Sequence, residues 1–161
     1  MNAARLILLS CWFGIAVFFS ATVAPAIFNS LRAFELTNAN EIAGTIVTRT
    51  LGVVNVSGAL IALLLILLAF VAQQQQQRIT FLIEIVSLVV MALATSIGHW
   101  MIAARMRALR AAMVLPIDQV RVDDSRRVEF SRLHVYSVTA LSIAIIAALI
   151  SIVLIARKPR A

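Results

Sequence analysis

Cysteine and charged residues are scarce in this chain of 161 residues. The single cysteine, Cys11, excludes an internal disulfide framework and a metal site built from several cysteines. Only 13% of the residues are charged and 62% are hydrophobic, which excludes an ordinary soluble domain. The sequence also lacks a phosphate-binding glycine loop, paired carboxylates and a nucleophile with a neighbouring base. We therefore expect no catalytic residues and no enzymatic activity.

Four long apolar runs fill most of the sequence. Each is long enough, at about 1.5 Å per residue, to cross a hydrocarbon core of roughly 30 Å. The expected spans are residues 6–28, 51–72, 79–104 and 135–156. The links between them are too short to hold a second core, so we expect residues 1–161 to form one domain. The predicted fold is all-α, an integral membrane four-helix bundle that runs up, down, up and down.

Two of the four helices are expected to extend beyond the bilayer. Pro116 stops the third helix, and the fourth begins before its apolar run, which gives an extramembrane helix–loop–helix at about residues 105–134. Short polar side chains are typical helix caps and precede the second and fourth helices. The candidate caps are Asn38, Asn40, Asp123, Asp124 and Ser125.

The ends and links of the chain carry simpler signals. Met1–Arg5 is short and basic, as in a signal peptide, but Pro25 disfavours cleavage, so we expect a retained first span that ends around Pro25. The glutamine-rich residues 73–78 predict a polar turn between antiparallel helices. Residues 157–161 are basic and predict a membrane anchor.

Arginine supplies almost all of the formal net charge of +7, because Lys158 is the only lysine. The arginines lie beside the apolar runs, where this side chain meets lipid headgroups, so we do not expect nucleic acid as a partner. Both sides of the membrane receive arginines, and the charge pattern does not fix the orientation. The residues predicted to contact lipid or a protein partner are Arg49, Arg105, Arg107, Trp12 and Tyr136.

Polar residues of different spans converge at one end of the predicted bundle. His99 lies just before the end of the third span, His134 at the start of the fourth, and Asn55 near the start of the second. The simplest interpretation is hydrogen bonding across helices, with no cofactor. Alternatively, two imidazoles at matched depth could hold haem b, or copper with help from Met101 and Met106.

Glu84 is the costliest residue in the predicted spans, because a buried carboxylate in lipid calls for a functional explanation. It lies close to the glutamine-rich turn, where it could reach water or Arg78. About 22 Å of helix separates it from His99, so the two cannot form an acid–base pair. One polar stripe of the third span is expected to face the bundle, and an ion path along it is an alternative. The stripe consists of Glu84, Ser87, Met91, Thr95 and His99.

Several short motifs together resemble a known family. Trp12-Phe13-Gly14, Val23-Ala24-Pro25, Ala43-Gly44 and Phe130-Ser131-Arg132-Leu133-His134 resemble the transmembrane protein 205-like family of small four-span proteins of unknown function. That family includes the cisplatin-resistance-associated transmembrane protein of animals and many bacterial members. Val135 stands where the family usually has glycine. The resemblance implies the four-helix fold and supplies no activity, while a more distant likeness to copper-resistance and haem-containing four-span proteins supports the metal alternative.

Small size, short loops and the absence of catalytic groups lead to one main functional hypothesis. We expect a non-enzymatic accessory or structural subunit of a larger assembly in a bacterial inner membrane. Its partners would be membrane lipids and other membrane subunits, or further copies of the chain. The alternatives are a haem- or copper-binding protein that uses His99 and His134, and a transporter of a small solute or ion.

Overall fold

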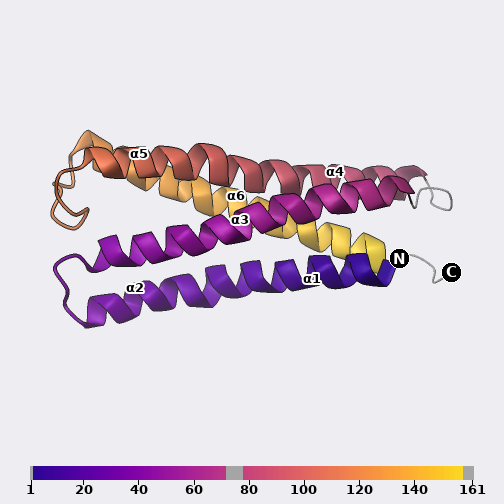
Figure 1. The fold of residues 1–161 in the computed structure, drawn as a ribbon, viewed down its shortest axis with the longest axis horizontal. Helices are drawn as coiled ribbons and strands as arrows, with labels where there is room; N and C mark the ends of the chain where they lie inside the picture. Colours follow the sequence, from indigo (N-terminus) through magenta and orange to yellow (C-terminus); the bar gives the residue numbers. More distant parts are fainter. Residues whose placement is uncertain (1, 72–77, 158–161) are drawn as a thin grey trace.

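The computed structural model describes residues 2–71 and 78–157, and throughout these ranges the chain forms an up-and-down bundle of long helices (Figure 1). Four helical stretches are long and apolar enough to cross a membrane. This confirms the predicted all-α membrane bundle. The predicted glutamine turn at 73–77 and the basic tail at 158–161 lie outside the described residues.

Pro25 does not end the first helix. α1 (Asn2–Phe18) continues through a π-helical segment, Phe19–Val23, into α2 (Ala24–Ala33). The Ala24 N–H donates back five residues to the Phe19 carbonyl. The wider π-turn gives the proline ring room that an α-turn would deny it. The helix therefore continues past the proline, where the sequence suggested a break, because the π-turn accommodates the ring.

The second half of the molecule repeats this design. After α3 (Ala39–Val71), α4 (Arg78–Ser96) passes through a second π-helical segment, Ile97–Ala103, into α5 (Ala104–Ala112). The chain returns along α6 (Ser125–Ala156).

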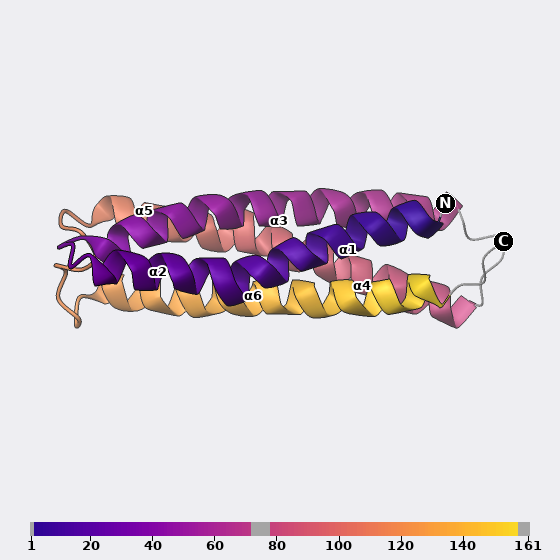
Figure 2. The same ribbon diagram turned by 90° about the horizontal axis from the view of Figure 1, so that it is seen from below.

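All four helical stretches are overlong, where only two were predicted. Each has 32 to 35 residues, although about 20 suffice to cross the bilayer. The first hairpin extends as far as the second because its helix runs on through Pro25. Figures 1 and 2 place the loops at 34–38 and 113–124 together at one end of the bundle, which we call the loop end. The start of α1 and the end of α6 lie at the other, the terminal end.

Different residues cap the two helices that begin at the loop end. The Asp124 side chain accepts the Arg126 N–H at 2.8 Å, which confirms Asp124 among the predicted caps of α6. At the start of α3, the Glu41 N–H donates to Asp118 at 3.1 Å. The capping carboxylate of α3 therefore comes from a loop 77 residues away in sequence, and not from the neighbouring asparagines.

Small side chains let the helices approach closely at the terminal end. There α4 packs against both α3 and α6, while α1 packs against α6 and α3. Close approach through small residues is the usual way in which membrane helices associate. Fully buried alanines come from three of the four helical stretches, and all but Ala43 lie away from the loop end: Ala16, Ala43, Ala62, Ala69, Ala144 and Ala148.

The bundle is looser at the loop end. Beyond the first π-helical segment, α2 packs mainly against α3. Figure 1 shows α3 lying between α2 and the α5–α6 pair in this region. The π-helical segment thus marks the level at which the first helix leaves the four-helix core.

Candidate functional site

The terminal end contains a buried ion pair that joins α1 to α4. Arg5 donates through Nη2 to Glu84 Oε1, and both side chains are fully buried. Glu84 was expected to reach water or Arg78, but Arg78 is exposed and the ion-pair partner is Arg5. The two residues meet because each lies a few positions inside its helix at the terminal end. Their opposite charges therefore lie in the same layer of the bundle.

Some buried polar atoms at the terminal end have no hydrogen-bond partner within the part of the chain that the structure describes. Arg5 Nε and Nη1 and the Ser151 hydroxyl are buried and have no hydrogen-bond partner within residues 2–71 and 78–157. Buried donors of this kind are uncommon in folded proteins. The sequence reading missed Arg5 and Ser151; the available signal was a basic residue at the same depth as Glu84.

The polar stripe of α4 faces the bundle, as predicted. Glu84, Ser87, Met91 and Thr95 are all buried. Thr95 donates to the Met91 carbonyl at 2.8 Å, so its hydroxyl is satisfied within its own helix. The stripe therefore consists of one ion pair and side chains packed into the core.

At the His99 end of this stripe, α3 packs closely against the π-helical segment Ile97–Ala103. His99 packs over Gly52, where an added Cβ would lie 3.6 Å from the imidazole Cε1. One turn along, Asn55 packs over Gly98, where an added Cβ would lie 3.2 Å from the amide nitrogen. Each helix thus supplies a glycine that receives the other's polar side chain. His99 Nδ1 is buried and has no hydrogen-bond partner among the described residues.

His134 occupies a different environment from His99. It is exposed on α6, as is Tyr136, whereas His99 is only partly accessible and faces α3. Within residues 2–71 and 78–157, no three histidine, cysteine or acidic side chains gather where they could hold a metal ion. The pairing of the two histidines through a cofactor remains a prediction.

Trp12 lies in the core, which corrects its predicted contact with lipid. Its side chain is 2% exposed and fills the space over Gly58, where an added Cβ would lie 2.7 Å from indole Cζ2. The indole N–H donates to the Val54 carbonyl at 2.9 Å. A buried Trp N–H in an apolar bundle needs such an acceptor, and the glycine lets the ring come close enough to reach it.

The three arginines predicted to contact lipid or a partner are all exposed at the loop end. Arg105 also donates to Glu129 of α6 at 2.9 Å, whereas Arg49 and Arg107 have no ion-pair partner in the described part of the chain. All three positions remain accessible to headgroups or to another protein.

Two carboxylates fasten the loop at 113–124 to the start of α3. Asp118 accepts from the Glu41 N–H and from the Asn40 side chain. Glu41 in turn accepts from Arg110 Nε at 2.6 Å and from the Ile117 N–H at 3.2 Å. The α2–α3 and α5–α6 hairpins are therefore joined outside the membrane by reciprocal polar contacts, which the sequence reading did not identify.

Two further carboxylates near the end of this loop are held in their charged form. A hydrogen bond from the Arg126 side chain lowers the pKa of Asp124 from 3.8 to about 2. Arg121 lowers the pKa of Asp123 in the same way. The loop thus keeps its charges at neutral pH.

Large apolar side chains are exposed at the tips of both loops. Val114 is 95% exposed, Val122 77% and Phe34 74%, with Leu36 and Leu115 also accessible. Exposed apolar residues on the spans are suited to lipid, but Arg49 is the last charged residue before the apolar run of α3, and the helix extends roughly 15 Å beyond it. Apolar side chains at this height are surrounded by water in an isolated chain.

Comparison with known proteins adds one finding. Residues 7–114 match the model of a family given as a domain of unknown function, DUF4149. The match covers the first three helical stretches and ends before α6. No curated protein and no solved structure shows significant similarity to the chain.

Proposed function

The chain belongs to the DUF4149 family, a domain of unknown function, and from this premise we propose that it is a non-enzymatic accessory subunit of a larger membrane assembly. The supporting observation is the group of exposed apolar side chains at the loop tips, which we call the tip surface: Phe34, Leu36, Val114, Leu115 and Val122. Apolar groups exposed to water in this way are characteristic of protein contact sites.

The charge around the tip surface indicates the chemistry of its partner. Exposed arginines of the second hairpin, including Arg107 and Arg132, lie at the same end of the bundle. Contacts of this kind combine an apolar centre with a charged rim. The charges next to the tip residues have both signs, because Glu35 lies between Phe34 and Leu36 while Arg121 and Asp123 flank Val122. The partner surface is therefore expected to carry apolar side chains bordered by charges of both signs.

Site-specific photo-crosslinking in native membranes tests this proposal. A photoreactive residue replaces Phe34 or Val122 at the tip surface, or Leu67, which is 65% exposed on the spanning part of α3, as the lipid-facing control. We expect one discrete protein adduct from both tip positions and lipid adducts from Leu67. Purification in mild detergent should then recover the same partner in a fixed ratio.

Two outcomes would contradict an accessory role. If neither tip position yields a protein adduct, the exposed apolar residues have no partner. If the adducts have twice the mass of the chain, the tip surface binds a second copy, and the assembly is a homo-oligomer without other subunits.

The remaining expectations belong to the same proposal. We infer that the chain carries no catalytic centre and needs no cofactor, and that it resides in a bacterial inner membrane with lipids and other subunits as partners. The Phe130–His134 segment supports kinship with the transmembrane protein 205-like family. The pairing of Glu84 with Arg5 favours a structural role for that carboxylate over ion transport.

A haem- or copper-binding function is the second candidate, favoured by the buried and unpartnered Nδ1 of His99. Because His134 is exposed, it would coordinate a haem or copper that is shared with another chain or bound at the lipid surface. An absorption spectrum and metal analysis of protein purified from a cofactor-replete host test this candidate. A Soret band or bound copper that disappears in His99→Ala and in His134→Ala would support it, and a colourless, metal-free protein would end it.

A further inference from the structure

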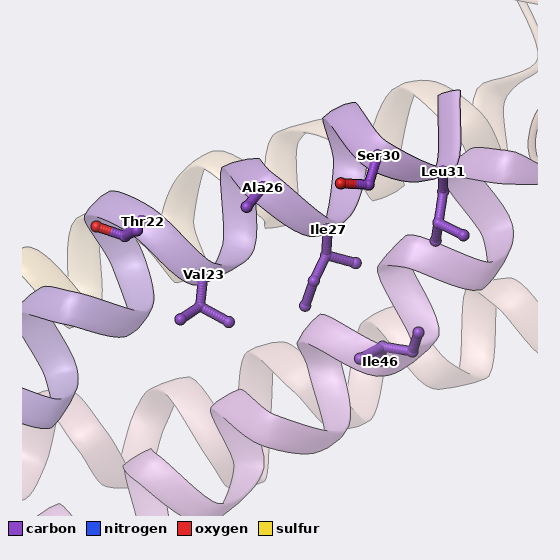
Figure 3. A pocket seen from close by; sticks show the side chains of 7 residues that line it. All are labelled: Thr22, Val23, Ala26, Ile27, Ser30, Leu31 and Ile46. Carbon is purple, nitrogen blue, oxygen red and sulfur yellow. The ribbon is translucent and has the colours of Figure 1, made fainter. Parts of the chain in front are cut away.

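An apolar groove runs along the outer surface between the first helix and α3 (Figure 3). It has a volume of about 440 Å³, within the range of small-molecule sites. Figure 3 shows Val23 and Ile27 pointing from the first helix towards α3, with Ile46 on the opposite wall. The lining residues are Thr22, Val23, Ala26, Ile27, Ser30, Leu31 and Ile46.

The groove lies next to the π-helical segment of the first helix. It begins at the end of the π-helical segment Phe19–Val23 and continues along α2, the part of the helix that packs mainly against α3. Pro25 lies between the lining residues Val23 and Ala26 and is itself exposed. The groove thus begins at the bulge that accommodates the proline.

The position of the groove along the bundle places it at the edge of the bilayer. Arg49 is the last charged residue before the apolar run of α3, and Ile46 lies one turn outside it. The stretch Thr22–Leu31 is about 14 Å long at the helical rise, so it extends from the headgroup level into the acyl region. The inner part of the groove therefore opens to lipid chains.

Two arginines lie near the groove in sequence: Arg32 follows Leu31 at its outer end, and Arg49 lies one turn inward of Ile46 on α3. The Arg32 guanidinium sits 5.6 Å from the centre of the Phe28 ring and donates to Asn40 at 2.9 Å. Arg49 is exposed and has no ion-pair partner in the described ranges. Helical side chains lean towards the N-terminus of their helix, and α2 and α3 run in opposite directions. Both guanidinium groups are therefore directed towards the level of Phe28 and Ile46.

We propose that this groove binds one anionic phospholipid, with an acyl chain along Val23, Ala26 and Ile27 and its phosphate paired with Arg49. Apolar walls that open to the bilayer suit a hydrocarbon chain, and a free guanidinium at the headgroup level suits a phosphate. The site lies at the edge of the bilayer and is separate from the tip surface. Its test is therefore independent of the proposed accessory role.

Photolabelling of the full-length protein in vesicles tests the site. The vesicles contain phosphatidylcholine with a small fraction of phosphatidylglycerol that carries a photoreactive acyl chain, and the adducts are located by mass spectrometry. We expect adducts concentrated on the peptides that hold residues 22–31 and 46. A photoreactive phosphatidylcholine should label the same peptides about fivefold less, the change that one arginine–headgroup contact supplies.

Two variants separate the parts of the proposed site. Arg49→Gln should lower phosphatidylglycerol labelling to the phosphatidylcholine level, while Ile46→Trp should fill the groove and reduce labelling by both lipids. Arg78→Gln, an exposed arginine at the terminal end, and Leu67→Trp, on the lipid-facing side of α3, are matched controls that should change neither.

Three results would overturn the proposal. Labelling spread evenly along all lipid-facing helices would show bulk lipid only. Equal labelling by both lipids that Arg49→Gln leaves unchanged would remove the headgroup site. A photoreactive residue at Ala26 that yields an adduct of twice the chain's mass would show a second copy in the groove.

Discussion

At the scale of single residues, the Arg5–Glu84 pair is the most demanding feature of the bundle. Both side chains are fully buried between helices that cross a membrane. Removing one partner of a buried ion pair leaves an uncompensated charge, which costs about 3–5 kcal/mol. Replacing both partners with apolar residues of similar size is often neutral or stabilising. The pair therefore contributes more to the specific alignment of α1 with α4 than to the net free energy of folding.

This gives a prediction with a built-in rescue. Glu84→Gln and Arg5→Met should each lower the free energy of unfolding in mixed micelles by about 3 kcal/mol or more, and the double variant Arg5→Met/Glu84→Met should recover most of the loss. Arg78→Met is the matched control, because Arg78 is exposed at the same end, and it should have little effect. Additive losses in the double variant would refute a direct pairing.

The sequence identified Glu84 as costly but not its partner. A carboxylate inside an apolar run is visible in any one-dimensional reading, whereas Arg5 is 79 residues away and meets Glu84 only after α1 has packed. The same limit applies to Trp12, whose aromatic character suggested the membrane interface. Its burial depends on Gly58 of another helix, a fit that no local pattern contains.

At the scale of whole elements, the sequence predicts helix ends well where the determinants are local. Asp124 caps α6 because its side chain reaches a backbone N–H two residues on, and α5 ends shortly before Pro116. Local signals failed at Pro25, because a π-helical turn removes the clash on which the prediction rested. They also failed at α3, where the capping carboxylate arrives from Asp118 in a distant loop.

The cap of α6 predicts a pH dependence. The hydrogen bond from Arg126 lowers the pKa of Asp124 from 3.8 to about 2. A depressed carboxyl pKa means that the folded state favours the charged form, so this stabilisation is complete above about pH 4 and disappears as the pH falls towards 2. We expect the protection factors of the amides in the first turn of α6, which normalise exchange to the intrinsic rate at each pH, to fall across that window.

Two substitutions of Asp124 separate the effect of its capping hydrogen bond from the effect of its negative charge. Asp124→Asn keeps a capping side chain without a titrating group, so the first turn should stay protected at neutral pH and lose its own pH dependence. Asp124→Ala should give low protection factors in this turn at every pH. An unchanged acid transition in Asp124→Asn would show that another group controls the turn.

At the scale of the whole molecule, the two ends of the bundle are held by different means. Helices at the terminal end meet through small residues and a buried ion pair. At the loop end, α3 is linked to the second hairpin through Asp118, Glu41 and Arg110. The loop-end contacts are only partly buried, so they can separate at lower cost than the terminal end. Both proposed binding surfaces, the groove and the tip surface, lie at this looser end.

The final prediction follows from this division. Asp118→Ala removes the cap of α3 and one side of the link between the hairpins, so it should lower the free energy of unfolding by about 1 kcal/mol. Spin labels at Thr37 and Val122, one on each loop, should report a broader distribution of distances. Asp123→Ala is the matched control: its pair with Arg121 stays within one loop and is largely exposed, so stability and distances should change little. If both variants behave alike, the loop does not hold the hairpins together, and packing between α3 and the second hairpin sets the shape of the loop end.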